Sequence, residues 1–425
     1  RAPMWLRANA SRLTAAEYRG RLASADISAE LLEGVPDAVR LAEAQSVDDL
    51  RACFTSWPSL PLNIVYADTS GTVGWQLIGD APDRRSGTGA VPRPASDPGT
   101  GWEPEPVAFE RLPHLRDPAS GFVATANNLP STETSWLGMD FLDGYRVARI
   151  VGALDARDDW DVTSTLEFQM DRTSLVWTEL REPVLAAVEG TRGAELLAAW
   201  DGVLSTDSAA ATVFEMMLGE LISAVVEAKA PSSAAVAMGA GFTPLVPFNS
   251  FLVRRTGHLV RLIREQPGGW FPEGWPGRIR AALRAAVEGL EATHGPGPAG
   301  WEWGEVRQLT LRHPLSMRKP LDRVFDLGPL PYGGDANTVN PAPVDPADPT
   351  GNPDFAVASL RVAIDIGEWE QCRFVLPGGQ SGNPFSRHYR DQYDLWRKGD
   401  ALPIAWSEPM VARSTRATLV LRPRG

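Results

Sequence analysis

The sequence has few of the residues that metal centres and disulfide frameworks need. Its 425 residues include only two cysteines, Cys53 and Cys372, and five histidines. The cysteines are far apart and match no metal-binding spacing, and the histidines form no HExxH or other paired motif. We therefore expect no zinc site. The two cysteines form either one long-range disulfide or, with at least equal weight, two free buried thiols.

Positive charge is also scarce, with 41 Lys and Arg against 53 Asp and Glu and a net charge of -12. Such a surface disfavours binding to nucleic acid or anionic lipid, and we expect neither a nucleic-acid nor a membrane partner. The sequence contains no apolar run that we expect to cross a bilayer. No signal peptide is recognised at Arg1-Ala2-Pro3, so we interpret the chain as cytosolic or as a piece of a processed or truncated protein.

The first 150 residues combine helical and strand patterns. Residues 11–55 are mainly helical in pattern, and Ser46 is a plausible start for a helix over 49–57. Residues 63–68 and 72–78 are predicted to form a hairpin around the turn at 69–71. A further strand is expected over 121–126, ending at Asn127-Asn128. Between these strands, residues 80–106 are rich in Pro, Gly, Asp and Arg, which indicates an ordered surface loop.

The middle of the chain is helical and its end returns to strands. Apolar residues recur at helical spacing over 214–225, behind Asp207-Ser208, and again over 279–290. Alternation with period two appears over 360–366, and strands are also expected over 374–376 and 418–421. This order predicts an α+β fold in which early and late strands share a sheet. We divide the chain into parts at 1–150, 151–305 and 306–425.

Four ordered segments carry a family resemblance. The first is residues 63–84, the second 121–128 followed by 143–150, the third 327–329 followed by 333–340, and the last 376–384 continuing to 396. Together they resemble the penicillin acylase (penicillin amidase) family of N-terminal-nucleophile (Ntn) hydrolases, and the chain resembles the C-terminal part of its large (beta) subunit. Because the segments occur in the family's order, chance similarity is a poor explanation.

The resemblance implies a fold, a chemistry and partners. The fold would be the αββα sheet sandwich of Ntn hydrolases, incomplete in this chain. Residues 1–150 would be the later part of the core with its oxyanion strand, 151–305 a helical insertion, and 306–425 the strands that complete the core. The activity would be amide hydrolysis by an N-terminal Ser upstream of Arg1, exposed when a zymogen processes itself. This chain alone would then be inactive.

The same resemblance supplies the remaining expectations. The partners would be a small alpha subunit and the upstream part of the large subunit, from the same precursor, together with a small N-acyl substrate. No cofactor is required for the chemistry. Some members bind a structural calcium ion, for which Glu133 is a candidate ligand. By resemblance the location is periplasmic or extracellular, with the cytoplasm also open.

Asn127 matches the asparagine whose side-chain amide helps to stabilise the tetrahedral oxyanion in this family. A neutral amide at a strand end suits that role because it donates a hydrogen bond without bringing a competing charge. The alternative is that Asn127-Asn128 simply caps the strand and starts a turn. The flanking matches favour the oxyanion role.

Arg146 matches the arginine that the family places near the amino terminus of the nucleophile, where it orders the site and tunes the base. A guanidinium is always charged and makes planar contacts with several donors, which suits such a position. The alternative is an ordinary ion pair with Asp140 or Asp143. Arg149 belongs to the same local motif, and we assign it a packing role.

The remaining motifs do not point to another chemistry. The glycine-rich segments at 333–335 and 378–382 lack a phosphate-loop pattern and are interpreted as tight turns beside the cleft. Neither Ser316 nor Ser381 lies in a GxSxG elbow, so neither is a candidate nucleophile. The main rival function is a non-catalytic binding or scaffold homologue. A carbohydrate-binding or cell-wall module, suggested by the 15 tryptophans, is a weaker alternative.

Overall fold

The computed structural model describes residues 40–57, 61–89, 91–243, 246–249, 254–352 and 356–420. They belong to two compact units. The first comprises residues up to 123 with 130–139 and 405 onward, and the second comprises 124–129 and 140–404. The described elements include both helices and strands, which confirms the α+β class. The helices expected over 11–39 lie outside the described residues.

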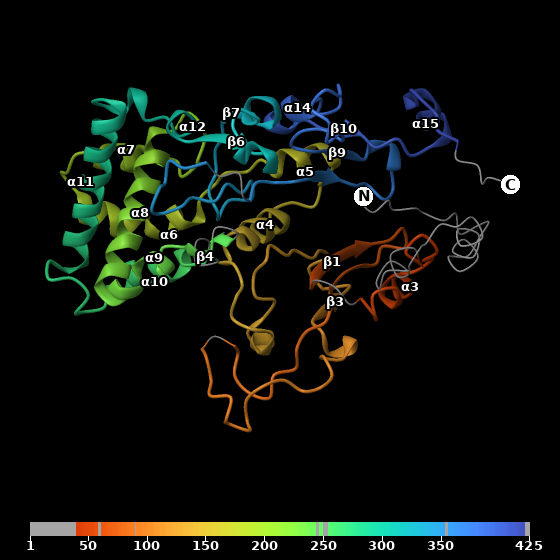
Figure 1. The fold of residues 1–425 in the computed structure, drawn as a ribbon, viewed down its shortest axis with the longest axis horizontal. Coiled ribbons are helices and arrows are strands. Elements are labelled where there is room, and N and C mark those ends of the chain that lie inside the picture. Colours follow the sequence, from red (N-terminus) through yellow and green to blue (C-terminus); the bar gives the residue numbers. More distant parts are fainter. Residues whose placement is uncertain are drawn as a thin grey trace. The chain divides into compact units, whose positions relative to one another are not determined.

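The first unit contains the predicted hairpin. Strands β1 (Leu62–Ala67) and β2 (Val73–Ile78) pair antiparallel, and β3 (His114–Arg116) adds to β2 (Figure 1). The turn between β1 and β2 is closed by Asp68, whose Oδ1 accepts the backbone N–H groups of Ser70 and Thr72 at 2.9 and 3.1 Å. Gly71 has φ 93°, a conformation that glycine adopts without steric cost.

Short helices complete this unit. They are α3 (Val47–Ala52), η1 (Phe109–Arg111), η2 (Thr132–Leu137) and α15 (Glu408–Ser414). Ser46 caps α3 by accepting the N–H of Asp49 at 3.1 Å, as its position suggested. The helix ends at Ala52 rather than at residue 57, because residues 53–56 form turns.

The second unit is mainly helical over residues 145–306, and buried side chains of α6, α7, α8, α10, α11 and α12 contribute to the larger core. Figure 1 shows α6, α8 and α11 lying together at one end of this unit, and α10 packs against α6 (Figure 1). The helices are α4 (Tyr145–Asp155), α5 (Val162–Phe168), α6 (Leu175–Val188), α7 (Ala194–Ala199), α8 (Ala209–Lys229), η3 (Pro231–Ser233), α9 (Ala234–Ala237), α10 (Thr256–Glu265), α11 (Gly274–His294), η5 (Pro298–Gly300) and α12 (Trp303–Val306).

Helix α8 is the centre of this core. Ser208 caps its first turn by accepting the N–H of Ala211 at 3.1 Å, and Phe214, Met217 and Leu221 are fully buried. Both long periodic segments predicted from the sequence are therefore helices, α8 and α11. By length and composition α8 could also span a bilayer, contrary to the expectation that no apolar run would. It is a buried core helix, with 61% of its apolar window inside the protein.

The later part of the second unit contains small sheets and short helices. Strands β6 (Gln308–Leu311) and β7 (Leu327–Pro331) pair antiparallel, and β8 (Arg361–Ala363), β9 (Arg373–Val375) and β10 (Leu402–Pro403) form a sheet in the order β10-β9-β8. Strands β4 (Ala240–Thr243) and β5 (Val246–Phe248) form a separate pair. The short helices are η6 (Pro314–Met317), α13 (Asp322–Phe325), η7 (Trp369–Gln371) and α14 (Tyr393–Lys398).

Three expectations about strands are wrong. Residues 121–126 form no strand, and neither do residues 418–420, because no described segment pairs with them; residue 421 is not described. The described strands form four separate sheets, so early and late strands do not share one.

The apolar alternation around strand β8 predicts that Leu360 and Ile364 face the core. The structure buries the other face of the strand. Arg361 and Ala363 are buried, whereas Leu360 and Ile364 are 51% and 56% exposed. Both terminal nitrogens of the buried Arg361 guanidinium are hydrogen-bonded: Nη1 donates to the carbonyl of Trp396 at 2.6 Å, and Nη2 donates to Tyr332 and Asn340. Its Nε has no partner among the described residues. Hydrogen bonding therefore decides which face of β8 is buried, leaving an exposed apolar pair at its ends.

The two cysteines are buried and free. The disulfide alternative is therefore wrong, and the free-thiol alternative is confirmed.

Candidate active site

Asn127 and Arg146 lie in direct contact. Arg146 is the second residue of α4, and its Nη2 donates to Oδ1 of Asn127 at 2.9 Å and to the backbone carbonyl of Ala126 at 2.7 Å. One arginine thus holds both the side chain of Asn127 and the backbone just before it. The sequence separates the two residues by 19 positions, and the fold brings them together.

This contact fixes the orientation of the Asn127 amide. A guanidinium has only donors, so Arg146 can bind the oxygen of the amide but not its nitrogen. The Nδ2 group must therefore face away from Arg146, and among the described residues it donates to no protein group. Asn127 is exposed, so a pair of N–H donors is presented to whatever lies beside it.

The backbone at Asn127 is unusual. Asn127 has φ 62°, a left-handed conformation that asparagine tolerates better than most residues. Its carbonyl accepts the N–H of Leu142 at 2.9 Å, which ties the turn to the segment leading into α4. This conformation aims the side chain differently from that of a residue in an extended strand.

Asn128, in contrast, closes the turn. Its Oδ1 accepts the N–H of Ala126 at 3.1 Å, and its Nδ2 donates to the carbonyl of Leu129 at 3.0 Å. The turn-forming role considered for the pair thus falls on the side chain of Asn128. The side chain of Asn127 is bound only by Arg146 among the described residues.

Within the described part of the chain, Arg146 forms no ion pair. Asp140 pairs with Arg254 at 2.5 Å, and Asp143 accepts the backbone N–H of Gly257 at 3.1 Å. Both acids named as alternative partners are therefore engaged elsewhere. Burial lowers the pKa of the Arg146 guanidinium, and the negative charge of Asp335 opposes this effect.

Arg149 anchors α4 to the next part of the unit. Its Nε and Nη2 bind the two carboxylate oxygens of Asp171 at 3.1 and 2.6 Å, and Thr173 donates to the same carboxylate. Burial raises the pKa of Asp171, but the hydrogen bonds from Arg149 and Thr173 outweigh it and leave the pKa below its usual value. A charged, bidentate ion pair therefore fixes α4, where we had expected packing.

The glycine-rich segments are places of close backbone approach, with bends at 378–382 and no assigned turn at 333–335. A Cβ atom at Gly333 would overlap the carbonyl of Leu204, and one at Gly379 would overlap the carbonyl of His388. At 378–382 the carbonyl of Gly378 accepts the N–H of Gln392 at 2.9 Å. The glycines allow backbones to approach closely, as the absence of a phosphate-loop pattern suggested.

The two serines excluded as nucleophiles form hydrogen bonds with neighbouring residues. Ser316 is buried and donates to the carboxylate of Asp326. Ser381 accepts the N–H of Asn383 at 3.2 Å.

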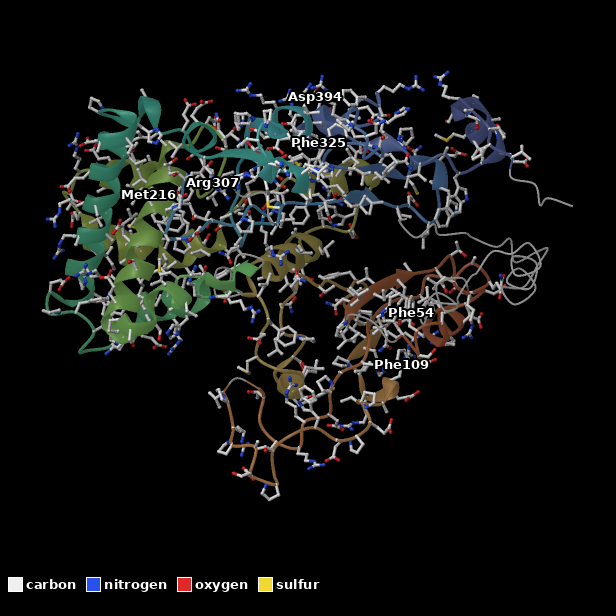
Figure 2. All side chains as sticks on the ribbon, in the orientation of Figure 1. Phe54, Phe109, Met216, Arg307, Phe325 and Asp394 are labelled. Carbon is white, nitrogen blue, oxygen red and sulfur yellow. The ribbon has the colours of Figure 1, made fainter. Side chains whose placement is uncertain are left out.

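A group of buried charges was not anticipated. Asp335, Glu215 and Arg307 are 3%, 4% and 0% exposed, and Figure 2 labels Arg307 (Figure 2). Arg307 donates to the carbonyls of Gly334, Ala342 and Pro343. The signal for Glu215 was present in the sequence, since it is an acid within the apolar stretch around Phe214 and Met217.

The calcium site considered from the resemblance stays a prediction, with Glu133 as its candidate ligand. The described residues contain no group of three or more His, Cys, Asp or Glu side chains that could hold a metal ion, and Glu133 is exposed in η2.

Comparison with known proteins gives one family. The family model described as penicillin amidase matches residues 20–413. The acyl-homoserine lactone acylase QuiP of Pseudomonas fluorescens is 28% identical over 89% of this chain and 48% of the relative. The penicillin acylase 2 proenzyme of a Pseudomonas species is 28% identical over 92% of this chain and 49% of the relative. This chain thus spans about half the length of these curated relatives.

A solved structure shares the fold. The thermostable penicillin G acylase of Alcaligenes faecalis aligns with a TM-score of 0.61 and 18% identity, over 92% of this chain and 73% of that chain. The Ntn-hydrolase fold expected from the resemblance is thereby confirmed.

Proposed function

The chain belongs to the penicillin amidase family, and on that premise we propose that it forms the C-terminal part of the catalytic subunit of an amidohydrolase. The enzyme cleaves the acyl side chain from a small N-acyl compound. Its nucleophile, an N-terminal Ser, lies upstream of this chain. The relatives are named as acylases, and the name of one includes the word proenzyme, which supports processing of a precursor.

The observation that carries this proposal is the fixed Asn127 amide. Arg146 holds Oδ1 at 2.9 Å, so Nδ2 is turned outward and exposed before any substrate arrives. Donors that are oriented in advance stabilise developing charge without the cost of reorganisation. By the family resemblance, Nδ2 of Asn127 binds the oxyanion and Arg146 orders the site.

The reaction proceeds by acyl transfer in two steps. The Ser hydroxyl oxygen forms a bond to the amide carbonyl carbon while the free α-amine of the same Ser accepts the hydroxyl proton. The carbonyl oxygen becomes negative and accepts a hydrogen bond from Asn127. The C–N bond then breaks, the leaving amine takes the proton, and water hydrolyses the acyl ester to release the acid and the free Ser.

The proposal covers several acyl groups. A β-lactam side chain, a fatty-acyl homoserine lactone and another N-acyl compound are all compatible with the described residues. The names of the relatives include both penicillin acylase and acyl-homoserine lactone acylase.

Exposed apolar residues support a partner chain. In the first unit Val65 and Leu115 are 55% and 45% exposed, and in the second unit Leu360 and Ile364 are more than half exposed. These residues lie on or beside short strands, where backbone edges are able to pair with further strands. We propose that the small alpha subunit and the upstream part of the large subunit bury these residues in the assembled enzyme. We further propose that the assembled enzyme is exported, and that calcium, if bound, needs ligands from those parts.

The test uses the intact, processed protein. Wild type is expected to release a chromogenic amine from phenylacetyl or long-chain acyl amides. Asn127→Ala removes the donor and is expected to lower kcat by about 100- to 1000-fold. Asn127→Asp retains the shape but places a carboxylate beside the oxyanion, and a similar or greater loss is expected.

Asn63→Ala is the matched control. Asn63 is also exposed, but its Oδ1 accepts the indole N–H of Trp75 at 2.8 Å in the first unit. Its substitution is expected to leave the rate unchanged. Absence of turnover by the wild type would favour the scaffold homologue. Unchanged turnover in Asn127→Ala would remove the oxyanion role.

A further inference from the structure

One buried carboxylate acts on Arg146 from a distance. Arg146 makes no ion pair among the described residues, yet its guanidinium is partly buried, where an uncompensated charge is costly. The negative charge of Asp335 favours the protonated, positively charged form of Arg146. Asp335 follows β7 in the Gly333-Gly334 segment and is 3% exposed.

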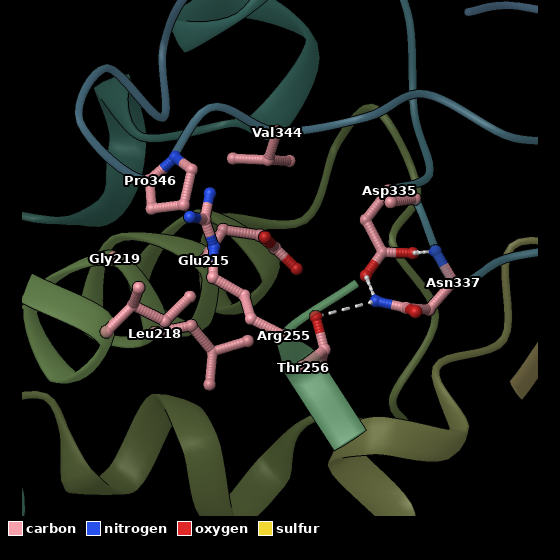
Figure 3. A pocket seen from close by; sticks show the side chains of 11 residues that line it. Glu215, Leu218, Gly219, Arg255, Thr256, Asp335, Asn337, Val344 and Pro346 are labelled. Atoms are coloured by element: carbon pink, nitrogen blue, oxygen red, sulfur yellow. Dashed lines mark hydrogen bonds between the residues drawn. The ribbon is translucent and has the colours of Figure 1, made fainter. Parts of the chain in front are cut away.

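A chain of contacts also leads from Asp335 toward Arg146. The Asp335 carboxylate accepts the backbone N–H of Asn337 at 2.8 Å and lies 3.4 Å from its side-chain nitrogen. The same nitrogen lies 3.4 Å from the hydroxyl of Thr256. Figure 3 shows Asn337 between Asp335 and Thr256, which is the first residue of α10 (Figure 3).

The start of α10 is in turn joined to the start of α4. The N–H of Gly257 donates to Oδ2 of Asp143 at 3.1 Å, and the N–H of Thr256 binds the same carboxylate. A Cβ atom at Gly257 would lie 2.9 Å from Oδ1 of Asp143, so the two segments are closely packed. Asp143 precedes α4 by two residues, and α4 carries Arg146.

We propose that Asp335 is a positioning residue that holds Arg146, and through it the amide of Asn127, by its charge and by the contacts through Asn337, Thr256 and Asp143. This inference deepens the proposed function and rests on it. Asp335 touches no reacting atom in this arrangement; its effect reaches the carbonyl oxygen only through Arg146 and Asn127.

The distance between the two charges has a chemical advantage. A carboxylate in direct contact with Nη2 of Arg146 would compete with Oδ1 of Asn127 and the carbonyl of Ala126 for the same donor. A buried acid further away stabilises the charge and leaves these hydrogen bonds intact. Burial raises the pKa of Asp335, while the hydrogen bonds from Asn337 and Thr338 and the charge of Arg307 act in the other direction and favour its ionised form.

Glu215 provides a matched control. It lines the same cavity of about 30 Å³ as Asp335, Asn337 and Thr256, and Figure 3 shows it entering from the side opposite Asp335. It is equally buried, at 4% exposed, and its Oε1 has no hydrogen-bond partner among the described residues. Burial and the nearby Asp335 raise the pKa of Glu215 well above its usual value, and Glu215 is not among the groups whose charge acts on Arg146.

The experiment compares variants of the intact, processed enzyme. Asp335→Asn keeps an acceptor for Asn337 and nearly the same volume, but removes the charge. We expect kcat to fall roughly tenfold to a hundredfold, less than for a lost oxyanion donor, with KM within about twofold. Inhibition by hexylboronic acid, which forms a tetrahedral anion on the nucleophile, should weaken in parallel. Asp335→Glu should restore part of kcat, and Glu215→Gln should change neither quantity.

Two results would overturn this inference. One is an Asp335→Asn variant with unchanged kcat while Asn127→Ala is inactive, which leaves the proposed function standing. If Asn127→Ala turns over as fast as the wild type, the oxyanion role of Asn127 fails instead, and a crystal structure of Asp335→Asn then decides. In that structure we expect the contact between Nη2 of Arg146 and Oδ1 of Asn127 to be lost; its retention at 2.9 Å would refute the positioning role.

Discussion

The guanidinium of Arg146 and the amide of Asn127 have complementary hydrogen-bonding groups. Arginine only donates, while the asparagine amide both donates and accepts, so their contact uses the acceptor and leaves the donors outward. A lysine at position 146 would have one compact charge in place of the planar group that reaches two acceptors. At the scale of single residues, the site therefore depends on hydrogen-bond direction as much as on charge.

The ion pair between Arg149 and Asp171 gives a prediction of stability. Arg149→Met is expected to lower the free energy of unfolding by about 1.5 kcal/mol at pH 7, since a charged bidentate contact is lost and the pair is partly exposed. The pKa of Asp171 is below its usual 3.8, so the contribution is present above that pH and disappears as the pH falls through the lower folded-state pKa. Chemical denaturation at pH 7 and near pH 2 measures both values.

Arg397→Met is the control for that measurement. Arg397 pairs with Asp394 at 2.7 Å, but their side chains are 42% and 74% exposed. A change near zero is expected, because exposed ion pairs contribute little. An equal loss in both variants would show that the Arg149 pair has no special role.

Glu215 gives a prediction with the opposite pH dependence. Burial and the nearby Asp335 raise the pKa of Glu215 well above 4.5, and Arg307 opposes the shift only in part. The folded protein therefore holds a proton that the unfolded chain has lost, and stability falls as the pH rises above 4.5, by up to about 1.4 kcal/mol per pH unit. Glu215→Gln should flatten this fall. Melting temperatures at pH 5 and pH 8 test it, and an unchanged pH dependence would contradict it.

At the scale of elements, we expect the N-terminal cap of α8 to contribute to the free energy of unfolding. The hydroxyl of Ser208 accepts the N–H of Ala211 at the start of this buried helix, and Ser208→Ala should cost about 1 kcal/mol. Ser233→Ala is the control, since Ser233 precedes α9 without a side-chain cap bond. Urea unfolding of the two variants compares them, and equal midpoints would contradict the role of the cap.

Helices were more predictable than strands because their signals are local. The apolar positions of α8 and α11 repeat within each helix, and Ser208 marks a boundary by its own hydroxyl. A strand depends on a partner elsewhere in the chain, which residues 121–126 do not have among the described strands. In β8 the alternation was visible, but the buried face was decided by Tyr332, Asn340 and Trp396, which accept the hydrogen bonds of Arg361.

The candidate site shows the same division. Asn127 and Arg146 were identified through a family resemblance, and spacing alone would have favoured a turn for Asn127. Their contact depends on φ 62° at Asn127 and on the direction of α4, neither of which has a local sequence signal that we recognised. The sequence shows Asp335 only as part of a glycine-rich segment. The contacts that lead from Asp335 toward Arg146 pass through the start of α10, and only the folded structure brings these segments together.

At the scale of the whole molecule, the chain spans about half the length of its curated relatives. Under the proposed function, we infer that the apolar residues beside β8 form part of an interface with another subunit. Ile364 is 56% exposed although the strand it follows belongs to a sheet of the second unit. Burying such residues against a partner removes apolar area from water, which favours assembly.

Ile364→Asp tests this interface. A carboxylate buried at a contact loses its hydration without a partner, so we expect a smaller yield of the assembled heterodimer after co-expression of the full precursor. Size-exclusion chromatography with subunit-specific staining measures the ratio of assembled to free large subunit. Met317→Asp is the control, because Met317 is 91% exposed in η6 and belongs to no strand. If Ile364→Asp and Met317→Asp assemble as fully as wild type, Ile364 lies outside the subunit interface, and the exposed apolar pair must have another cause.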